Sequence, residues 1–300
     1  MAPALTIIIP TYKRPIGLEK TLTSVDRYRP PDAEVIVVDQ SPGSGEHARH
    51  IHGRFPYVHY IHCSQPNLPA ARNAGIKNSS GAIIFFTDDD AVLDPACLGE
   101  HLAMHEQHDL YAVAGRIKQM KEISWANTSV VAEVNRETGE ALGNFDLDYE
   151  GEVLYASGGH FSIKRELLEA VGLFNPLFKG NALFEDVEFF NRVRKKGFTV
   201  TYNPRAVIYH YPEDSGGCHE AEGSAYLTDR LYNHTLYYLL TIGVIPSRPF
   251  ILYVKNLIEY ISRNPHNGHN PLRILSCMLS IVSAYKNALV STITVPKWPL

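Results

Sequence analysis

The chain has 300 residues, 45% of them hydrophobic and 20% charged, and a formal net charge of −4. This composition excludes a disordered or a collagen-like chain, and the length fits one large α/β domain with an appendage, or two small domains. Residues 231–300, the tail, contain six Lys and Arg residues and one acidic residue, so the tail is basic and residues 1–230 are acidic. An acidic front without a basic stripe argues against nucleic-acid binding, whereas a basic, apolar tail suits an anionic surface or a helical cap.

The cysteines and the apolar runs indicate the cellular compartment of the protein. None of the four cysteines forms a C-x-x-C pair, which disfavours a zinc site or a disulfide framework and fits a reducing compartment. The run Leu5–Pro10 is too short for a signal peptide. The longest uncharged run of the tail, Leu231–Ser247, is too short and too polar for a membrane span. We expect a cytoplasmic protein, or one that rests peripherally on the cytosolic face of a membrane.

Short β-branched runs alternate with helical stretches over the first 115 residues. In chain order, the pattern predicts strand Leu5–Ile9, helix Pro15 to about Tyr28, strand Glu34–Val38, strand Tyr57–Ile61, helix Leu68–Lys77, strand Ala82–Phe86, helix Pro95 to about Gln107 and strand Tyr111–Ala114. This alternation predicts an α/β fold with a mostly parallel, Rossmann-like sheet flanked by helices. Ligands of such sheets bind at the carboxyl ends of the strands.

The second half of the chain is less regular. We expect ordered segments at Tyr155–Gly159 and His160–Lys164, a helix at Phe184–Lys196, short strands at Thr199–Tyr202 and Ala206–Tyr209, and a helical tail from about Ala221. The sequence accordingly predicts one domain over residues 1–220 and a basic, amphipathic helical extension over residues 221–300.

Three adjacent aspartates, Asp88, Asp89 and Asp90, follow the predicted strand Ala82–Phe86. Adjacent carboxylates repel one another, and that repulsion costs stability unless a cation compensates it. Asp88 and Asp90 point to the same side if the strand continues, so together they can hold Mn²⁺ or Mg²⁺, which prefer oxygen ligands and share coordination with phosphates. The alternative is a solvated acidic turn in which Asp90 caps a helix. The position after a buried strand favours the metal site.

Other polar residues also follow predicted strands directly. Thr11 and Tyr12 come after the first strand, and Asp39 ends the second. Because the carboxyl ends of parallel strands meet at one edge of a sheet, we expect these residues and the three aspartates to lie on the same rim.

Six segments, in their order and spacing, give the chain a specific resemblance. They read LTIIIPTYKRP, VIVVDQS, NLPAARNAGI, IIFFTDDD, SGGHFSIKRE and FEDVEFFNRV. Over roughly residues 4–212 the chain resembles the family 2 inverting glycosyltransferases. Their fold is of the GT-A type, a single nucleotide-binding α/β domain extended by an acceptor-binding half. The resemblance implies a nucleotide-binding half over about residues 1–115 and an acceptor-binding half over about residues 116–220.

The resemblance also assigns roles to matching positions. The residues implied to bind the nucleotide are Pro10, Thr11, Tyr12, Arg14, Asp39, Arg72, Asp88 and Asp89. Those implied to border the donor sugar and the acceptor are Gly158, Gly159 and His160, although many relatives carry Asn at the position of His160. His210 is implied as a third metal ligand beside Asp88 and Asp90. Asp186 is implied as the catalytic base with Glu185 as the alternative, and helix capping is the other reading of this acidic pair.

The implied reaction is inverting transfer of a sugar from a UDP-, GDP- or dTDP-sugar to a glycan or lipid-linked glycan, with Mn²⁺ or Mg²⁺, in polysaccharide or cell-surface glycan synthesis. A non-catalytic sugar-nucleotide-binding scaffold is the alternative from another class, but binding alone needs no base. A sugar-phosphate nucleotidyltransferase would carry a glycine-rich loop where this chain has PTYKRP. Aromatic and basic residues of the tail suit a membrane interface, and a packed cap or a homodimer interface is the other reading.

Overall fold

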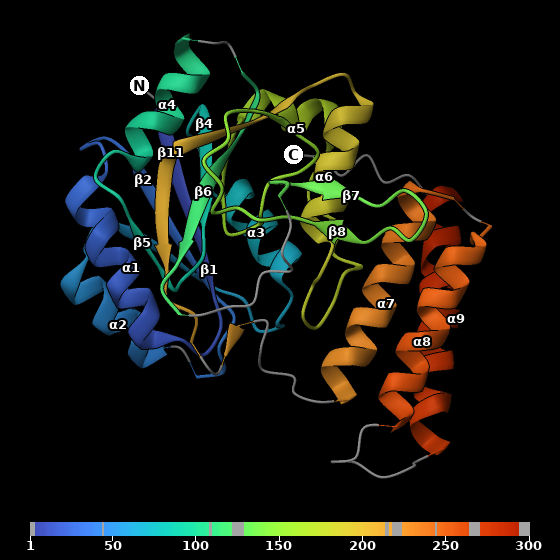
Figure 1. Cartoon of the computed structure of the whole chain (residues 1–300). Helices are drawn as coiled ribbons and strands as arrows, with labels where there is room; N and C mark the ends of the chain where they lie inside the picture. Colours follow the sequence, from blue (N-terminus) through green and yellow to red (C-terminus); the bar gives the residue numbers. More distant parts are fainter. Residues whose placement is uncertain are drawn as a thin grey trace.

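Figure 1 presents the computed structural model of the chain, which describes residues 4–43, 45–107, 110–121, 129–213, 216–217, 224–243, 245–263 and 271–293. The elements in chain order are β1 (Leu5–Thr11), α1 (Pro15–Tyr28), β2 (Glu34–Asp39), α2 (Gly45–Arg54), β3 (Val58–His62), α3 (Leu68–Lys77), β4 (Ile83–Thr87), β5 (Ala91–Leu93), α4 (Cys97–Gln107), β6 (Ala112–Gln119), β7 (Glu133–Val134), β8 (Ala141–Leu142), β9 (Gly151–Val153), β10 (His160–Lys164), α5 (Arg165–Val171), α6 (Glu185–Lys195), β11 (Val200–His210), α7 (Ser224–Thr241), α8 (Arg248–Arg263) and α9 (Pro271–Ile293).

One large sheet organises the molecule. Its strand order is β3-β2-β1-β4-β10-β6-β11-β5, and β9 pairs with β11. The strands β3, β2, β1 and β4 are parallel, β10 is antiparallel to β4 and β6, and β11 is parallel to β6. The predicted α/β fold with a mostly parallel, helix-flanked sheet is confirmed.

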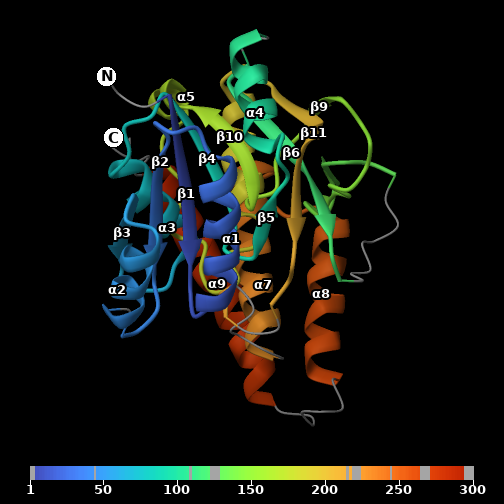
Figure 2. The ribbon, with the colours of Figure 1, turned by 90° about the vertical axis from the view of Figure 1, so that its left-hand side faces the viewer.

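Helices cover both faces of this sheet. In Figure 1, α1 and α2 lie to the left of the sheet, α4 at its upper end, and α3 and α6 to its right, and the turned view of Figure 2 places α1 in front. A strand covered on both faces can be apolar throughout. The central strand β1 is buried along its whole length, which explains why most of its residues are apolar.

Local signals set the helix boundaries near the cleft. Pro15 is the first residue of α1, where its fixed φ and missing N–H are tolerated. The side chain of Asn67 accepts a hydrogen bond from the N–H of Ala70 over 2.8 Å and so caps α3.

The helices α7, α8 and α9 stand beside the α6 side of the sheet (Figure 1). Buried residues of α7, such as Tyr232 and Leu236, belong to the main hydrophobic core, and Leu231 forms a smaller core with Cys277 of α9. None of the helices in the described ranges combines the length and the apolarity that crossing a membrane requires. The predicted start of the tail, residues 221–223, lies outside the described residues.

Several elements differ from the sequence prediction: β5 and α5 were not predicted, and the differences at α2 and β11 have a clear physical reason. Helix α2 was not predicted, because Ile51 is its one buried residue and the helix therefore has no apolar period to detect. The two short strands predicted around Pro204 form one strand, β11, whose register to β6 shifts between Asn203 and Val207. A proline without an N–H cannot continue the ladder, which explains the irregularity at the point where the prediction broke the strand.

Candidate active site

A cleft of about 520 Å³ opens at the carboxyl ends of β1 and β4. The residues predicted for the site that line it are Pro10, Thr11, Tyr12, Arg14, Arg72, Asp88, Asp89, Asp90, Gly158, Gly159, Glu185, Asp186 and His210. Residues far apart in the sequence are therefore brought together, as the strand-end rule predicts.

The cleft also contains residues that the sequence reasoning did not identify. Gln40 follows β2, Asn67 caps α3, and the segment 180–184 precedes α6. Ala182 and Phe184 in this segment have positive φ angles of 50° and 71°. Such backbone is uncommon for residues other than glycine and clusters at functional sites, but the sequence gives no sign of it.

Arg14 and Thr11 bind two of the three aspartates, Asp89 and Asp90. Thr11 Oγ1 donates a hydrogen bond to Asp89 Oδ2 over 2.6 Å, and Arg14 Nη1 lies 3.2 Å from Asp89 Oδ1 and 2.7 Å from Asp90 Oδ2. Burial, followed by the charge of Asp90, raises the pKa of Asp89 to about 7 against the opposing effect of Arg14. The contacts of Asp89 therefore join the carboxyl end of β1 to the segment after β4.

Asp88, Asp90 and His210 form a second group at the same strand end. One ligand atom from each lies within 4.8 Å of the others. His210 Nε2 is 3.1 Å from Asp90 Oδ1, and His210 Nδ1 is 2.8 Å from Gln119 Oε1. Burial lowers the pKa of His210, but the hydrogen bond and charge of Asp90 and the charge of Asp88 raise it overall.

This group fits a divalent cation. Asp90 Oδ1 is buried and faces His210 Nε2 at 3.1 Å, and no described residue donates a hydrogen bond to the half-buried carboxylate of Asp88. Carboxylates that lie close together repel one another, and a hard cation would offset this repulsion. Oxygen ligands with one imidazole suit Mn²⁺ or Mg²⁺.

The glycine pair before β10 lets the backbone approach these side chains closely. A Cβ atom on Gly159 would lie 2.1 Å from Asp88 Oδ2, and one on Gly158 would lie 2.6 Å from Arg72 Nη2. Any side chain at either position would displace a charged group of the cleft.

Arg72 is buried in an ion pair with Glu185. Its guanidinium donates to Glu185 Oε1 and, over 2.9 Å, to the carbonyl oxygen of Gly158. Burial raises the pKa of Glu185 to about 7, against the opposing charge of Arg72. The contacts of Arg72 therefore join α3, α6 and the glycine pair.

Asp186 lies in the first turn of α6 and is half-buried. Its Oδ2 accepts a hydrogen bond from the N–H of Gly158 over 2.9 Å, and its Oδ1 accepts one from the N–H of Val187 over 2.8 Å. Burial raises the pKa of Asp186, and the charge of Arg72 and these N–H groups oppose the rise. The result is an oriented carboxylate with raised basicity at the wall of the cleft.

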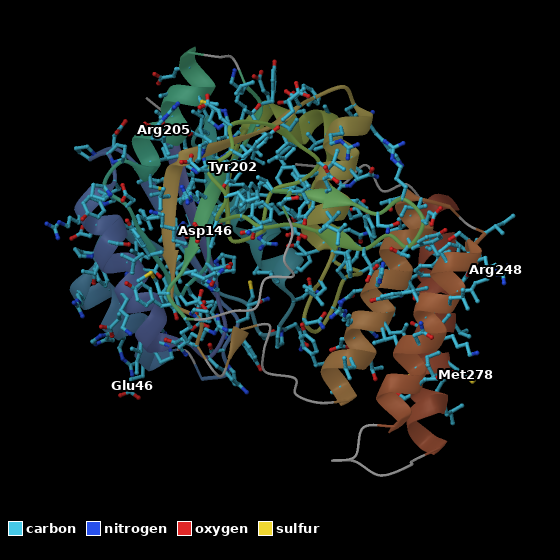
Figure 3. The ribbon with its side chains drawn as sticks, viewed as in Figure 1. Glu46, Asp146, Tyr202, Arg205, Arg248 and Met278 are labelled. Carbon is cyan, nitrogen blue, oxygen red and sulfur yellow. The ribbon has the colours of Figure 1, made fainter. Side chains whose placement is uncertain are left out.

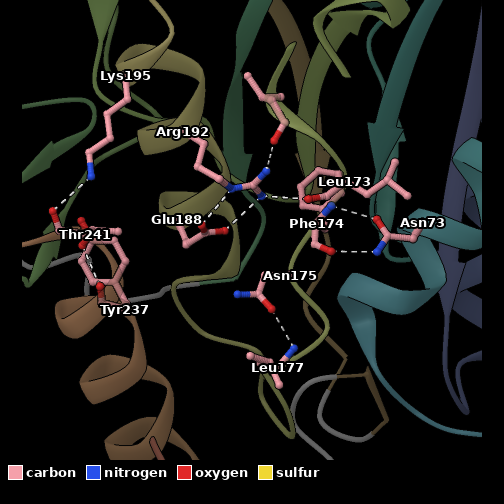
Figure 4. A network of polar contacts seen from close by, with 11 residues as sticks. Asn73, Leu173, Phe174, Asn175, Leu177, Glu188, Arg192, Lys195, Tyr237 and Thr241 are labelled. Atoms are coloured by element: carbon pink, nitrogen blue, oxygen red, sulfur yellow. Dashed lines mark hydrogen bonds and ion pairs between the residues drawn. The ribbon is translucent and has the colours of Figure 1, made fainter. Parts of the chain in front are cut away.

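A polar network fixes the position of α6 (Figure 4). Arg192 pairs with Glu188 over 2.8 Å and donates to the carbonyl oxygen of Leu173 over 2.8 Å. The side chain of Asn73 on α3 makes two hydrogen bonds, of 2.8 and 2.9 Å, with the backbone of Phe174. Because this network connects α3 with α6, it also helps to fix where Arg72 meets Glu185.

Asp39 ends β2 but is not a lining residue of the cleft. Tyr60 donates a hydrogen bond to its Oδ2, and the N–H of Ser41 donates to its Oδ1 over 2.7 Å. Burial raises the pKa of Asp39, but the hydrogen bonds of His47, Ser41 and Tyr60 lower it overall.

His160 also lies away from the cleft, contrary to the expected place beside the donor sugar and the acceptor. Its side chain is fully buried and contacts Cys97 and His101 of α4. Side chains alternate between the two faces of a strand. Because Phe161 packs on Phe86 and Phe174 on the other face, His160 points toward α4.

The large sheet, the cleft at its edge and the three aspartates after β4 together define a fold of the GT-A glycosyltransferase type. The solved mannosyltransferase PcManGT from Pyrobaculum calidifontis, in complex with GDP-Man and Mn²⁺, superimposes with a TM-score of 0.58 at 18% identity, over 97% of this chain and 79% of that one. The sequence profile of glycosyl transferase family 2 matches residues 6–172. The chain therefore belongs to glycosyl transferase family 2.

Two sequence relatives agree with this assignment. The chain is 25% identical to the glycosyltransferase AglE of Haloferax volcanii over 285 residues, which is 90% of this chain and 86% of AglE. It is 25% identical to the succinoglycan biosynthesis protein ExoM of Rhizobium meliloti over 205 residues, which is 66% of this chain and 64% of ExoM. The match to ExoM thus spans slightly less than two thirds of that protein. The expectation of family 2 membership is confirmed.

Proposed function

We propose that the chain transfers a sugar from a nucleoside diphosphate sugar to a hydroxyl group of a glycan or lipid-linked glycan, with inversion at the anomeric carbon and with Mn²⁺ or Mg²⁺. The observation that carries the proposal is the meeting, in one cleft, of a cation-type group (Asp88, Asp90 and His210) with an oriented carboxylate, Asp186. A cation site and a base are the two components that this reaction requires.

Asp88, Asp90 and His210 would hold the metal ion. When bound, the ion would offset negative charge on the diphosphate as it leaves. PcManGT, whose structure contains GDP-Man and Mn²⁺, supports a nucleotide-sugar donor and a divalent cation for this chain.

The chain's own residues bind and orient the two substrates. Pro10, Thr11 and Tyr12 provide the rim beside which the nucleoside would lie. Arg14 neutralises Asp89 and Asp90 and keeps the strand end in place. Arg72 supplies buried positive charge beside Asp88 where the diphosphate would lie.

Asp186 is the better base of the acidic pair. Glu185 also borders the cleft, but it is 3% exposed and its carboxylate is ion-paired with Arg72, so it is less accessible to an acceptor. Asp186 is half-buried and lines the cleft. It takes the proton from the acceptor hydroxyl as the acceptor oxygen attacks the anomeric carbon from the face opposite the leaving nucleotide.

The test is a transferase assay of the full-length chain with a panel of UDP-, GDP- and dTDP-sugars and Mn²⁺. Turnover or slow donor hydrolysis with one donor class supports the proposal. Nucleotide binding without turnover on any donor and acceptor would favour the non-catalytic scaffold instead.

We also propose that the helical extension rests on the cytosolic face of a membrane, where a lipid-linked acceptor would be presented. Exposed apolar residues of α9 recur at helical spacing, namely Leu275, Met278, Leu279, Val282, Leu289 and Val290. Met278 and Arg248 point outward on this side of the molecule (Figure 3). An apolar stripe accompanied by basic residues suits an anionic lipid surface. Self-association through the same stripe is the other outcome of the test given in the Discussion.

A further inference from the structure

A cluster of five polar side chains lies between α4 and the sheet, on the face opposite the cleft. Cys97, His101 and His105 are spaced four residues apart and share one face of α4, and His160 and Ser162 share one face of β10. All five are at most 2% exposed. The reaction proposed above uses none of them.

The imidazoles form a continuous chain of contacts with carbonyl groups at both ends. His105 Nδ1 lies 2.6 Å from the carbonyl oxygen of Leu110, and His105 Nε2 lies 2.7 Å from Ser162 Oγ. Ser162 Oγ lies 2.8 Å from His101 Nδ1, and His101 Nε2 lies 3.1 Å from His160 Nε2. His160 Nδ1 lies 3.2 Å from the carbonyl oxygen of Arg116.

The five contacts cannot all be hydrogen bonds, because each would need a proton and too few protons are present. A neutral imidazole carries one N–H and a serine one O–H, so the three histidines and Ser162 supply four protons. Both end carbonyls are acceptors and require an N–H. Donors and acceptors can then be assigned to this series of contacts inward from each end. The assignment leaves His101 Nε2 and His160 Nε2 without protons, so their lone pairs face each other at 3.1 Å.

Cys97 does not remove the shortage. Its Sγ lies 3.4 Å from His160 Nε2, so its single proton serves this additional contact and the contact between the two imidazoles still has none. The contacts of the three imidazoles within the described residues include no carboxylate. A protonated imidazole would therefore be a buried charge without a counter-ion, which is costly.

We propose that Cys97, His101 and His160 bind a transition-metal ion, with Zn²⁺ as the best match. One ligand atom from each lies within 4.8 Å of the others. Zinc bonds of about 2.0–2.1 Å to nitrogen and about 2.3 Å to sulfur turn the separations of 3.1 and 3.4 Å into ligand–metal–ligand angles of about 100°. Both of these angles are near the tetrahedral value. The thiol gives up its proton on binding, and the thiolate and the two lone pairs form the bonds.

The surrounding contacts are those of oriented metal ligands. Metal-bound histidines usually donate their other N–H to a carbonyl, a carboxylate or another oxygen. His101 donates to Ser162, which His105 orients, and His160 donates to the carbonyl oxygen of Arg116. Gly115 leaves the room that His160 needs, because a Cβ there would lie 2.1 Å from His160 Cε1.

The site would tie α4 to the start of β10. His160 directly follows Gly159, whose carbonyl oxygen accepts a hydrogen bond from the N–H of Asp88 over 3.3 Å. A metal ion at His160 would thus help to position the backbone beside the cleft. Its role would be structural, since none of its ligands lines the cleft.

The first experiment measures metal in the unmodified full-length protein. The protein is dialysed against EDTA to strip any ion from the exposed cleft, its metal content is measured by mass spectrometry, and the retained metal is examined by X-ray absorption. We expect about one zinc ion per chain, bound by one sulfur and two imidazole nitrogens. Folded protein that retains no metal, or retained zinc without a sulfur ligand, overturns the proposal.

The second experiment assigns the ligands. Protein produced in cobalt-supplemented medium should show a thiolate-to-cobalt charge-transfer band. The band should be lost in Cys97→Ser and kept in Cys277→Ser, a matched change of a second fully buried cysteine. If Cys97→Ser does not fold, the X-ray absorption result on the unmodified chain decides. A charged imidazole detected by nitrogen NMR in metal-free, folded protein would show that a proton fills the contact instead.

Discussion

The backbone N–H of Gly158 donates a hydrogen bond to Asp186 Oδ2 over 2.9 Å. This bond joins the glycine pair before β10 to the first turn of α6, two segments that the resemblance assigned to the donor sugar and to the base. It also directs the Asp186 carboxylate into the cleft. Burial raises the pKa of Asp186 by more than the charge of Arg72 and the orienting N–H groups lower it.

Asp186→Asn should abolish turnover and preserve nucleotide binding. The amide keeps the shape of the side chain but cannot accept the acceptor's proton, and a general base contributes typically about 10²–10⁴-fold to the rate. The measurement is steady-state transfer alongside calorimetric titration with the nucleoside diphosphate. Asp26→Asn, at a half-exposed acid of α1, is the control that should behave as the unmodified protein. Turnover within about threefold of normal in Asp186→Asn would remove Asp186 as the base.

Gly159→Ala should weaken metal-dependent nucleotide binding. The added Cβ would lie 2.1 Å from Asp88 Oδ2, so Asp88 must move out of its place beside Asp90 and His210. We expect at least a tenfold loss of affinity, about 1.4 kcal/mol, for the nucleoside diphosphate in the presence of Mn²⁺.

The matched control is Gly53→Ala on α2, where a Cβ meets nothing within 4 Å. It should bind nucleotide normally and gain about 0.5–1 kcal/mol of stability, because alanine favours the helix over glycine. Equal affinities in the two variants would contradict the account of the Gly159 contact.

His234 should make the fold less stable in acid. It is buried on α7 and stacked against Phe184 with ring centroids 4.4 Å apart, and burial lowers its pKa to about 4. An unfolded histidine titrates near about 6.5. Between these pH values the histidine is protonated in the unfolded state but neutral in the folded state. The free energy of unfolding therefore falls as pH falls, by up to about 1.4 kcal/mol per pH unit.

The measurement is urea unfolding of the full chain at a series of pH values from about 6.5 down to about 4.5. His234→Phe, which preserves the aromatic stacking, should have a shallower dependence of stability on pH than the unmodified chain. An unchanged slope would contradict the assignment of this dependence to His234.

Replacing the apolar stripe should release the chain from membranes. Leu279→Glu combined with Val282→Glu puts two charges at side chains that are 60% and 64% exposed on α9, so the fold should tolerate them. Flotation with anionic liposomes should carry the unmodified chain upward and leave the double variant behind. Equal flotation would contradict the membrane proposal, and a change from dimer to monomer in light scattering without any flotation would assign the stripe to self-association.

Much of the nucleotide-binding half could be predicted from the sequence because its signals are local. Strands β1 and β4 are mostly apolar, and polar residues stand at or directly after their carboxyl ends. The topology of a parallel sheet then places Thr11 and Asp88 on one rim. Pro15 and Asn67 mark helix starts that agree with the structure.

The contacts within the site could not be predicted in this way. The partners Arg72 and Glu185 are 113 residues apart, and the sequence around Arg72 does not indicate that its side chain forms a buried ion pair. The orientation of His160 depends on the strand's alternation, and the motif SGGH does not say which residue is the first of the strand. The spacing rule for cysteines also gave no sign of the cluster around Cys97, because its other members are histidines on α4 and β10.

The most direct test of the central claim is the thermal unfolding of the full chain with UDP, GDP, dTDP or CDP, each with and without Mn²⁺, for the unmodified protein and Asp88→Ala. A ligand at about 100 times its dissociation constant adds about 2.7 kcal/mol of stability. The account predicts that one of these nucleotides raises the Tm only when Mn²⁺ is present, and that Asp88→Ala loses this increase. No shift with any nucleotide, or an undiminished shift in Asp88→Ala, would contradict it.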